Sequence, residues 1–224
     1  MLGNDDWSRI DRRSVLAASG VAATVGLAGC LGSLSDEDNP EGELHERYGY
    51  PSTDMEEEPP VEADHTVELL MDPPEDDDAP PEFYFDPAGL AIDAGDVIRF
   101  EFHSPDHAVA AFHEAFGRTH RAPENAEPIS SPMMEVGTYW LCQFDEPGVW
   151  DIYCPPHEFL GMGMRLVVDE ASGPATDPAN PDYEGAERPP EPALAATFNA
   201  ETLAPDNILD ESSVPWDDID IDDA

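Results

Sequence analysis

Three side chains that bind soft transition metals lie within nine residues of one another in the second half of the chain. Cys154, His157 and Met162 supply a thiolate, an imidazole and a thioether, with two residues between the first pair and four between the second. An ion that cycles between Cu(I) and Cu(II) needs a soft sulfur and imidazoles in a trigonal plane, with a weak thioether beyond it. The spacing therefore predicts a mononuclear copper site on one loop.

The residues on either side of this loop predict the strands that hold it. Apolar side chains recur in residues 148–153 before the loop and in residues 164–168 after it. Short apolar stretches bounded by turn residues are typical of β-strands. We expect the loop to connect two strands tightly, which places the metal ligands at one end of a β structure.

With this ligand loop, residues 64–170 resemble a type 1 blue-copper domain of the plastocyanin and halocyanin kind. Such domains take a second His from an upstream segment with the form strand, polar turn, Pro, His, apolar strand. Here residues 97–102 and the turn from His103 to His107 have that form. The resemblance implies an all-β, cupredoxin-like Greek-key sandwich that binds one Cu(I)/Cu(II) ion through His107, Cys154, His157 and Met162.

One position departs from the family pattern. The family often carries Asn directly after the upstream His, where the side chain ties the two ligand loops together, and this chain has Ala108. The backbone N–H of Ala108 can still approach the Cys sulfur. Because hydrogen bonds around the ligands tune a metal site, the reduction potential cannot be copied from relatives.

Neighbouring residues leave alternatives open. His103, His113 or His120 could replace His107, although surface histidines are more often solvated polar residues. Met164 has the wrong spacing for an axial ligand and is expected to fill the core. Cys142 is most simply a buried thiol, since a dinuclear copper centre would want a second Cys within the ligand loop.

The composition indicates a protein adapted to concentrated salt. Fifty-one acidic residues face nine basic ones, all of them Arg, and the formal net charge is -42. Repulsion of this size opposes a compact state in dilute buffer, whereas molar salt shortens the Debye length to about 3 Å. Nucleic acid is excluded as a partner, because nothing here could neutralise phosphates.

The N-terminal residues predict an export signal and a lipid anchor. Arg12 and Arg13 resemble the pair of a twin-arginine signal over residues 1–29, and a run of small apolar residues leads to Cys30. Cys30 is then expected to carry a lipid and to hold the protein at the outer face of the cell membrane. An uncleaved membrane helix, or a signal cut without lipidation, remains the alternative.

The rest of the chain divides by composition. Residues 30–63 are acidic and Pro-rich and predict a flexible tether, and residues 171–224 predict a disordered acidic tail. Residues 64–170 contain short strand-like stretches separated by turns, which favours a single β-sandwich domain. The expected strands are 65–71, 83–85, 90–92, 97–102, 108–112, 138–144, 149–154 and 165–168.

The function expected from these features is one-electron transfer, not enzymatic catalysis. We expect a monomer that exchanges electrons with redox proteins of the membrane electron-transport chain. An apolar surface around the edge of His157 should dock them, formed by Pro155, Pro156, Phe159 and Leu160. Copper storage or delivery is the alternative; a copper oxidase or nitrite reductase would need a second copper centre, and a metal-free structural lipoprotein would not need Cys154.

Overall fold

The computed structural model describes residues 44–74, 79–185 and 187–221. The predicted signal over residues 1–29, the predicted anchor Cys30 and the first part of the predicted tether lie outside the described residues. In the described part of the chain, no helix has the length and apolar character needed to cross a membrane.

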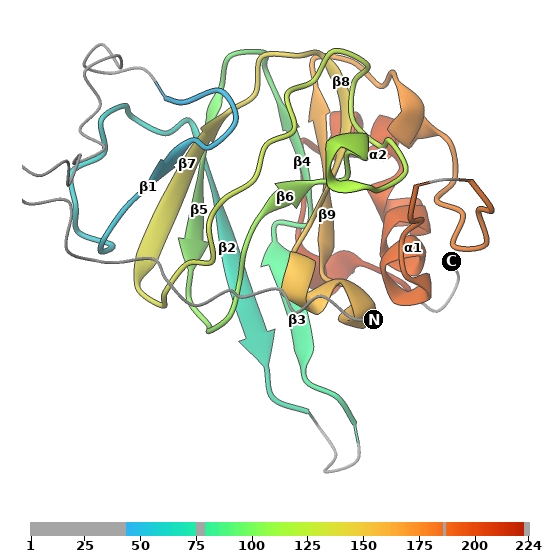
Figure 1. The fold of residues 1–224 in the computed structure, drawn as a ribbon, viewed down its shortest axis with the longest axis horizontal. Helices are drawn as coiled ribbons and strands as arrows, with labels where there is room; N and C mark the ends of the chain where they lie inside the picture. The colour runs from blue at the N-terminus through green and yellow to red at the C-terminus, as the bar shows by residue number, and fades with distance from the viewer. Residues whose placement is uncertain (1–43, 75–78, 186, 222–224) are drawn as a thin grey trace, which may run out of the picture. The chain divides into compact units, whose positions relative to one another are not determined.

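Two five-stranded sheets form the described domain (Figure 1). The first has the order β1-β7-β5-β2-β3 and the second the order β10-β4-β9-β8-β6. The pairs β2/β5 and β4/β9 are parallel, and the other neighbours are antiparallel. The predicted β-sandwich is confirmed. The bounds are β1 Tyr50–Pro51, β2 His65–Asp72, β3 Glu82–Asp86, β4 Gly89–Ile92, β5 Val97–Phe102, β6 Ala110–Ala111, β7 Thr138–Gln143, β8 Gly148–Tyr153, β9 Gly163–Val168 and β10 Ser213–Val214.

The main core lies between the two sheets and follows the two-residue period of the strands. In β5, Ile98, Phe100 and Phe102 are fully buried, while Arg99 and Glu101 are only partly buried. Alternate side chains of a strand point to opposite faces, so the three apolar residues face the second sheet. They meet Trp150, Ile152, Met164 and Leu166 there, in one cluster that also contains Cys154 and Met162.

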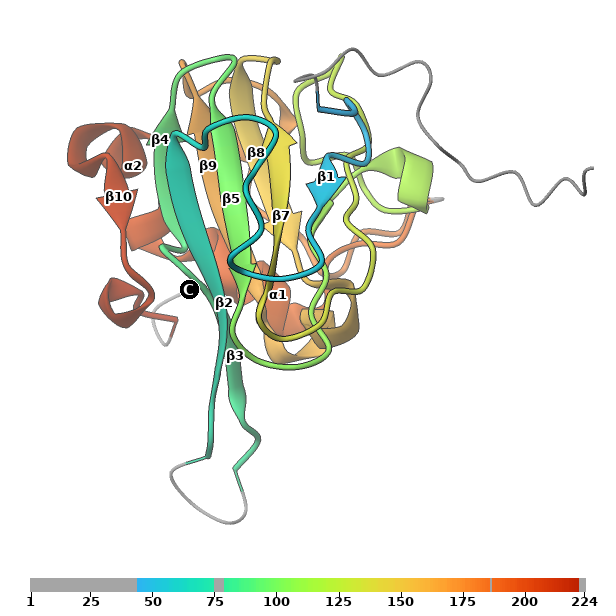
Figure 2. The same cartoon turned by 90° about the vertical axis from the view of Figure 1, so that its left-hand side faces the viewer.

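The outer face of the first sheet is covered by residues 44–63, which corrects the prediction of a flexible tether for this part. Apolar residues of this segment pack against Val97, Tyr139 and Leu141. The indole N–H of Trp140 donates to the Tyr48 carbonyl at 2.7 Å, and Figure 2 shows the segment crossing in front of β5 and β7. The segment was predicted to be flexible because it is acidic and Pro-rich. The apolar residues that make the contact are Leu44, Tyr50, Met55, Val61 and Ala63.

The outer face of the second sheet is covered by the C-terminal segment, so the prediction of a disordered tail is wrong for residues 171–185 and 187–221. Helices α1 (Pro192–Asn199) and α2 (Pro205–Glu211) each begin at a proline, whose fixed φ suits the first position of a helix. They lie on the side of β9 away from β5 (Figure 1). Short 3-10 helices complete the segment: Pro174–Thr176, Glu201–Leu203 and Trp216–Asp218.

Apolar contacts explain why this segment folds. Leu203, Ile208, Val214 and Trp216 pack on the outward side chains of Val149 and Val167. A second cluster joins residues of α1 to β6 and β8, and every residue of β8 and β9 is buried. The few apolar residues of an otherwise acidic segment are thus the ones that meet the sheet.

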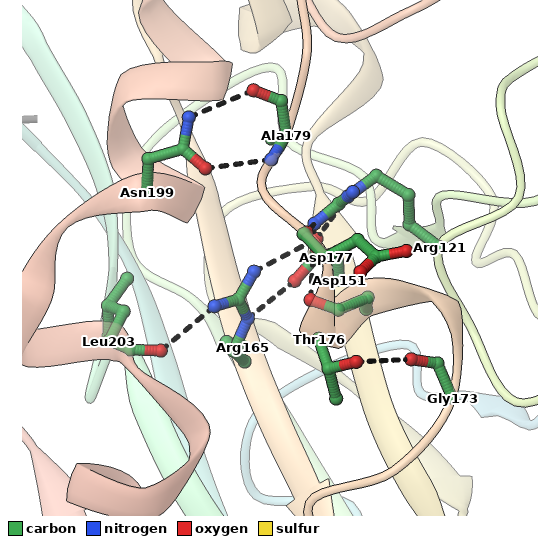
Figure 3. A network of polar contacts seen from close by, with 10 residues as sticks. Arg121, Asp151, Arg165, Gly173, Thr176, Asp177, Ala179, Asn199 and Leu203 are labelled. Atoms are coloured by element: carbon green, nitrogen blue, oxygen red, sulfur yellow. Dashed lines mark hydrogen bonds and ion pairs between the residues drawn. The ribbon is translucent and has the colours of Figure 1, made fainter.

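A buried ionic network fastens the same segment (Figure 3). Asp151 of β8 is fully buried and pairs with Arg121 at 2.6 Å and with Arg165 at 2.8 Å. Arg165 also donates to the Leu203 carbonyl at 3.0 Å, and Arg121 to the Asp177 carbonyl at 2.9 Å. Both arginines therefore link the carboxylate of β8 to the backbone of the C-terminal segment.

Candidate metal centre

The predicted ligand loop connects β8 to β9, as the sequence indicated. Cys154 follows β8 directly, residues Pro155–Leu160 form a 3-10 helix, and Gly161 ends it with a positive φ of 85°. The Cys154 N–H donates to the Met162 carbonyl at 3.1 Å, and the His157 N–H donates to the Cys154 carbonyl at 3.0 Å. These bonds close the loop on itself and bring its side chains back toward the core.

The structure brings three of the four predicted ligands together through their donor atoms. The Sγ of Cys154 lies 3.6 Å from Nδ1 of His107 and 3.5 Å from Nδ1 of His157. The three donor atoms lie within 4.8 Å of one another, and all three residues are buried. A metal ion can bind all three atoms at these separations. The bond lengths known for zinc, about 2.3 Å to sulfur and about 2.0 Å to nitrogen, serve as the measure. One thiolate and two imidazoles are the donor set that copper uses in electron-transfer sites.

The second nitrogen of His107 is fixed by a neighbour. Ser104 Oγ lies 2.6 Å from His107 Nε2, and both residues are buried. Nδ1 is thereby left toward the Cys154 sulfur, and metal-binding histidines commonly use their other nitrogen in this way. Ser104 lies in the turn from His103 to His107, but its type and position alone did not indicate this contact.

Burial keeps both imidazoles in the neutral form that can bind a metal. It lowers the pKa of His107 to about 4, with a further contribution from nearby His157. It also lowers the pKa of His157, which the Asp106 carboxylate partly offsets. Each ring thus has a nitrogen lone pair available at neutral pH.

The thiol of Cys154 is buried beside two backbone donors. Burial raises its pKa to about 12, while the N–H groups of Ala108 and His157 oppose the shift. The Ala108 N–H therefore approaches the sulfur, as expected from the sequence. Because burial disfavours the thiolate, a bound cation is what would keep this sulfur ionised at neutral pH.

Met162 is placed beside the group by the backbone of the loop. It is fully buried in the core cluster that contains Cys154, and its carbonyl accepts the Cys154 N–H. Met164 lies two residues further along, within β9, and is also buried in this cluster. Its position agrees with the expected core role.

The alternative residues lie in other surroundings. His103 is 3.2 Å from Glu101, and the rings of His113 and His120 contact each other with centroids 4.6 Å apart. None of these three belongs to the cluster around the Cys154 sulfur. Cys142 is buried in β7, where burial raises its pKa.

Besides Ser104, a second residue that contacts the predicted ligands was not identified from the sequence. Phe83 of β3 stacks on the ring of His157, with centroids 3.8 Å apart and planes 15° apart. The rings of Phe83 and His107 also form a T-shaped pair, with centroids 5.8 Å apart. No spacing in the sequence connects residue 83 to the ligand loop. The contact depends instead on the folded position of β3 beside that loop.

The residues predicted to dock partners lie at the surface beside His157. Phe159 is 64% exposed, Pro155 is exposed, and Pro156 and Leu160 are half-buried. They share the 3-10 helix with His157, which is itself buried. The loop therefore turns its imidazole inward and part of its apolar surface outward.

Comparison with known proteins finds similarity to copper proteins. Residues 77–169 match the family of copper binding proteins described as the plastocyanin/azurin family. The pseudoazurin of Paracoccus pantotrophus is 33% identical over 90 residues, which cover 40% of this chain and 54% of the relative. The chain thus spans about half the length of the curated relative it matches.

Solved pseudoazurins also resemble the chain. The protein from Hyphomicrobium denitrificans is 22% identical, with a TM-score of 0.38, over 48% of this chain and 76% of its own. The protein from Methylobacterium extorquens AM1 is 22% identical, with a TM-score of 0.37, over 66% of this chain and 96% of its own.

Proposed function

We propose that this chain, which contains a type 1 blue-copper domain of the cupredoxin family, carries single electrons between redox proteins. In this proposal its one copper ion is held by His107, Cys154, His157 and Met162. The observation that carries it is the convergence of one buried thiol and two buried, neutral imidazoles within 4.8 Å of one another. The chain is then a carrier and not an enzyme.

Contacts around the proposed ligands support electron transfer because they hold the ligands in fixed positions. When bound, copper supplies the change between Cu(I) and Cu(II). Ser104 fixes the ring of His107, Phe83 packs against the ring of His157, and the loop hydrogen bonds hold Cys154. Donors locked by a packed core move little when the charge of the site changes. A site whose ligands move little between the two oxidation states favours electron transfer over exchange of the ion.

Met162 is proposed to hold the ion weakly through its thioether. Three observations support this: the loop spacing, its full burial in the cluster of Cys154, and its backbone bond to that residue. A weak thioether ligand would tune the potential of such a site.

Electrons are proposed to enter and leave through the ring of His157, across the apolar surface of Pro155, Pro156, Phe159 and Leu160. The exposure of Phe159 supports this choice. Concentrated salt screens long-range charge steering, so apolar contact should dominate the encounter with redox proteins of the membrane.

We further propose that Cys30 carries a lipid and holds the protein at the outer face of the cell membrane. Support comes from the paired Arg12 and Arg13 and from the small residues before Cys30. Mass spectrometry of the protein extracted from its own cells tests this. A lipid on Cys30, and release of Cys30→Ser into the medium, are expected; an unmodified thiol on a retained protein would contradict it.

An optical spectrum of the copper-loaded full chain in high salt tests the main proposal. We expect intense visible absorption from thiolate-to-Cu(II) charge transfer, lost in Cys154→Ala and kept in the matched variant Cys142→Ala. A reversible one-electron couple with slow copper exchange would separate electron transfer from storage or delivery. Rapid exchange, or absorption that survives in Cys154→Ala, would contradict the proposal.

A further inference from the structure

The residue next to the predicted ligand His157 is a buried carboxylate. Glu158 is only 3% exposed, and both of its oxygens accept bonds of 2.6 Å from the guanidinium of Arg118. Arg188 of the C-terminal segment adds a third bond at 3.2 Å. A buried charge is tolerated only where such partners satisfy it. The ligand loop is thus fixed at this point by two arginines from outside it.

Helix α1 contacts the other end of the same loop. The hydroxyl of Thr197, which is fully buried, donates to the Gly161 carbonyl at 2.8 Å. At Gly163 a Cβ atom would lie 2.5 Å from Leu194 and 2.8 Å from Phe198. The helix therefore packs directly on the backbone where the loop enters β9, and a side chain at residue 163 would have to displace Leu194 and Phe198.

The segment that bears Arg188 is itself anchored. The Arg188 N–H donates to the Gly117 carbonyl at 2.8 Å, and the Thr119 N–H donates to the Arg188 carbonyl at 2.9 Å. The Arg188 guanidinium also pairs with Glu191, directly before α1, at 2.6 Å. The ligand loop, residues 117–119 and residues 188–197 are consequently tied into one unit.

We propose that residues 188–197, here called the clamp, position the copper ligands by holding the loop at Glu158 and Gly161. A 3-10 helix is a short element with poorer hydrogen-bond geometry than an α-helix, so external contacts have to fix the His157 ring against the Cys154 sulfur. Arg188 and Thr197 are positioning residues that act through Glu158 and Gly161. This inference rests on copper binding at the proposed site.

Two substitutions in the clamp test it. Thr197→Val removes one hydroxyl at constant shape, and Arg188→Gln removes a guanidinium whose side chain is 53% exposed. Thr176→Val is the matched control, since Thr176 donates to Gly173 in the same segment without touching the ligand loop. Thr197→Ser restores the hydroxyl. Circular dichroism establishes that each variant is folded.

Copper release and backbone opening are both measured. In the copper-loaded full chain in high salt, Thr197→Val and Arg188→Gln should release copper to a chelator about tenfold faster, as expected when a residue that supports a ligand is lost. The intensity ratio of the visible absorption bands should also change in both variants. In the copper-free chain, the Gly161 amide should exchange hydrogen faster in Thr197→Val, while Thr176→Val and Thr197→Ser should match the parent.

The outcomes separate the two proposals. Folded Thr197→Val and Arg188→Gln with parental release, spectrum and amide exchange would overturn the clamp. A parent chain that takes up no copper would overturn the proposed function, and the exchange of the Gly161 amide would still decide whether the clamp holds the loop.

Discussion

The ring of Phe83 lies flat against the imidazole of His157, 3.8 Å away and nearly parallel to it. Phe83 belongs to β3 of the first sheet, whereas His157 follows β8 of the second. The contact therefore spans the sandwich at the end where the ligands meet, and it shields one face of the proposed electron-transfer ring from water.

Phe83→Ala should raise the pKa of His157 in the copper-free protein. Burial lowers this pKa from its ordinary value of 6.5 because it disfavours the charged ring, so admitting water should move it back toward 6.5. An NMR titration of the His157 ring measures the change. Phe159→Ala, which truncates an exposed ring on the same loop, is the control. An unchanged pKa in Phe83→Ala would show that Phe83 does not desolvate the ligand.

The copper-free protein should lose stability as the pH falls from about 6.5 to about 4. The pKa of His107 is lowered to about 4 in the folded chain, whereas an unfolded His titrates near 6.5. Between these values the unfolded state binds more protons, so the free energy of unfolding falls as the pH falls through this window. Denaturant midpoints at several pH values and constant salt measure it.

His107→Asn provides the comparison for this pH dependence. Carboxylates titrate in both proteins, so the difference between their curves isolates His107. The variant should lose less stability than the parent across the window. Identical curves would mean that the imidazole of His107 is not held neutral by the fold.

Asp151→Ala should lower the free energy of unfolding by about 3–5 kcal/mol, the usual cost of breaking a buried ion pair. Two guanidinium groups, those of Arg121 and Arg165, would lose their shared buried partner. Urea unfolding in high salt measures the loss. Asp177→Ala is the control, because Arg121 contacts only the backbone carbonyl of that exposed residue. Equal losses in the two variants would contradict a special role for Asp151.

Replacing Phe159 and Leu160 by Ser should slow electron transfer about fivefold or more without bleaching the copper. Truncating an apolar anchor commonly costs about 1 kcal/mol or more of binding. Stopped-flow kinetics with membranes from the same cells measure the rate. Tyr183→Ser, which removes an exposed ring from the C-terminal segment, serves as control. An unchanged rate would rule out this surface as the docking site.

The ligand loop could be predicted because its chemistry is local in sequence. Cys154, His157 and Met162 lie on one short connection, and the alternating strands around it are recognisable from their period. His107 required the family resemblance, since 47 positions separate it from Cys154. The contact of Phe83 with His157 depends on the pairing of whole strands, which no local pattern shows.

The two coverings of the sandwich were missed for a different reason. Acidic residues and prolines dominate residues 44–63 and 171–221, and such composition ordinarily predicts disorder. The informative pattern lay in the sheet: β8 and β9 carry apolar residues such as Val149 and Val167 on the outward face. Strands that are apolar on both faces need a cover on each side.

Both sheets also end in ways that discourage growth by further strands. Three of the four border strands, β1, β6 and β10, are only two residues long. The fourth, β3, has Glu82 and Asp86 at its ends. Very short or charged borders offer a poor template for another chain to pair with. The protein can thus resist fibrous self-association through backbone geometry, even where salt screens electrostatic repulsion.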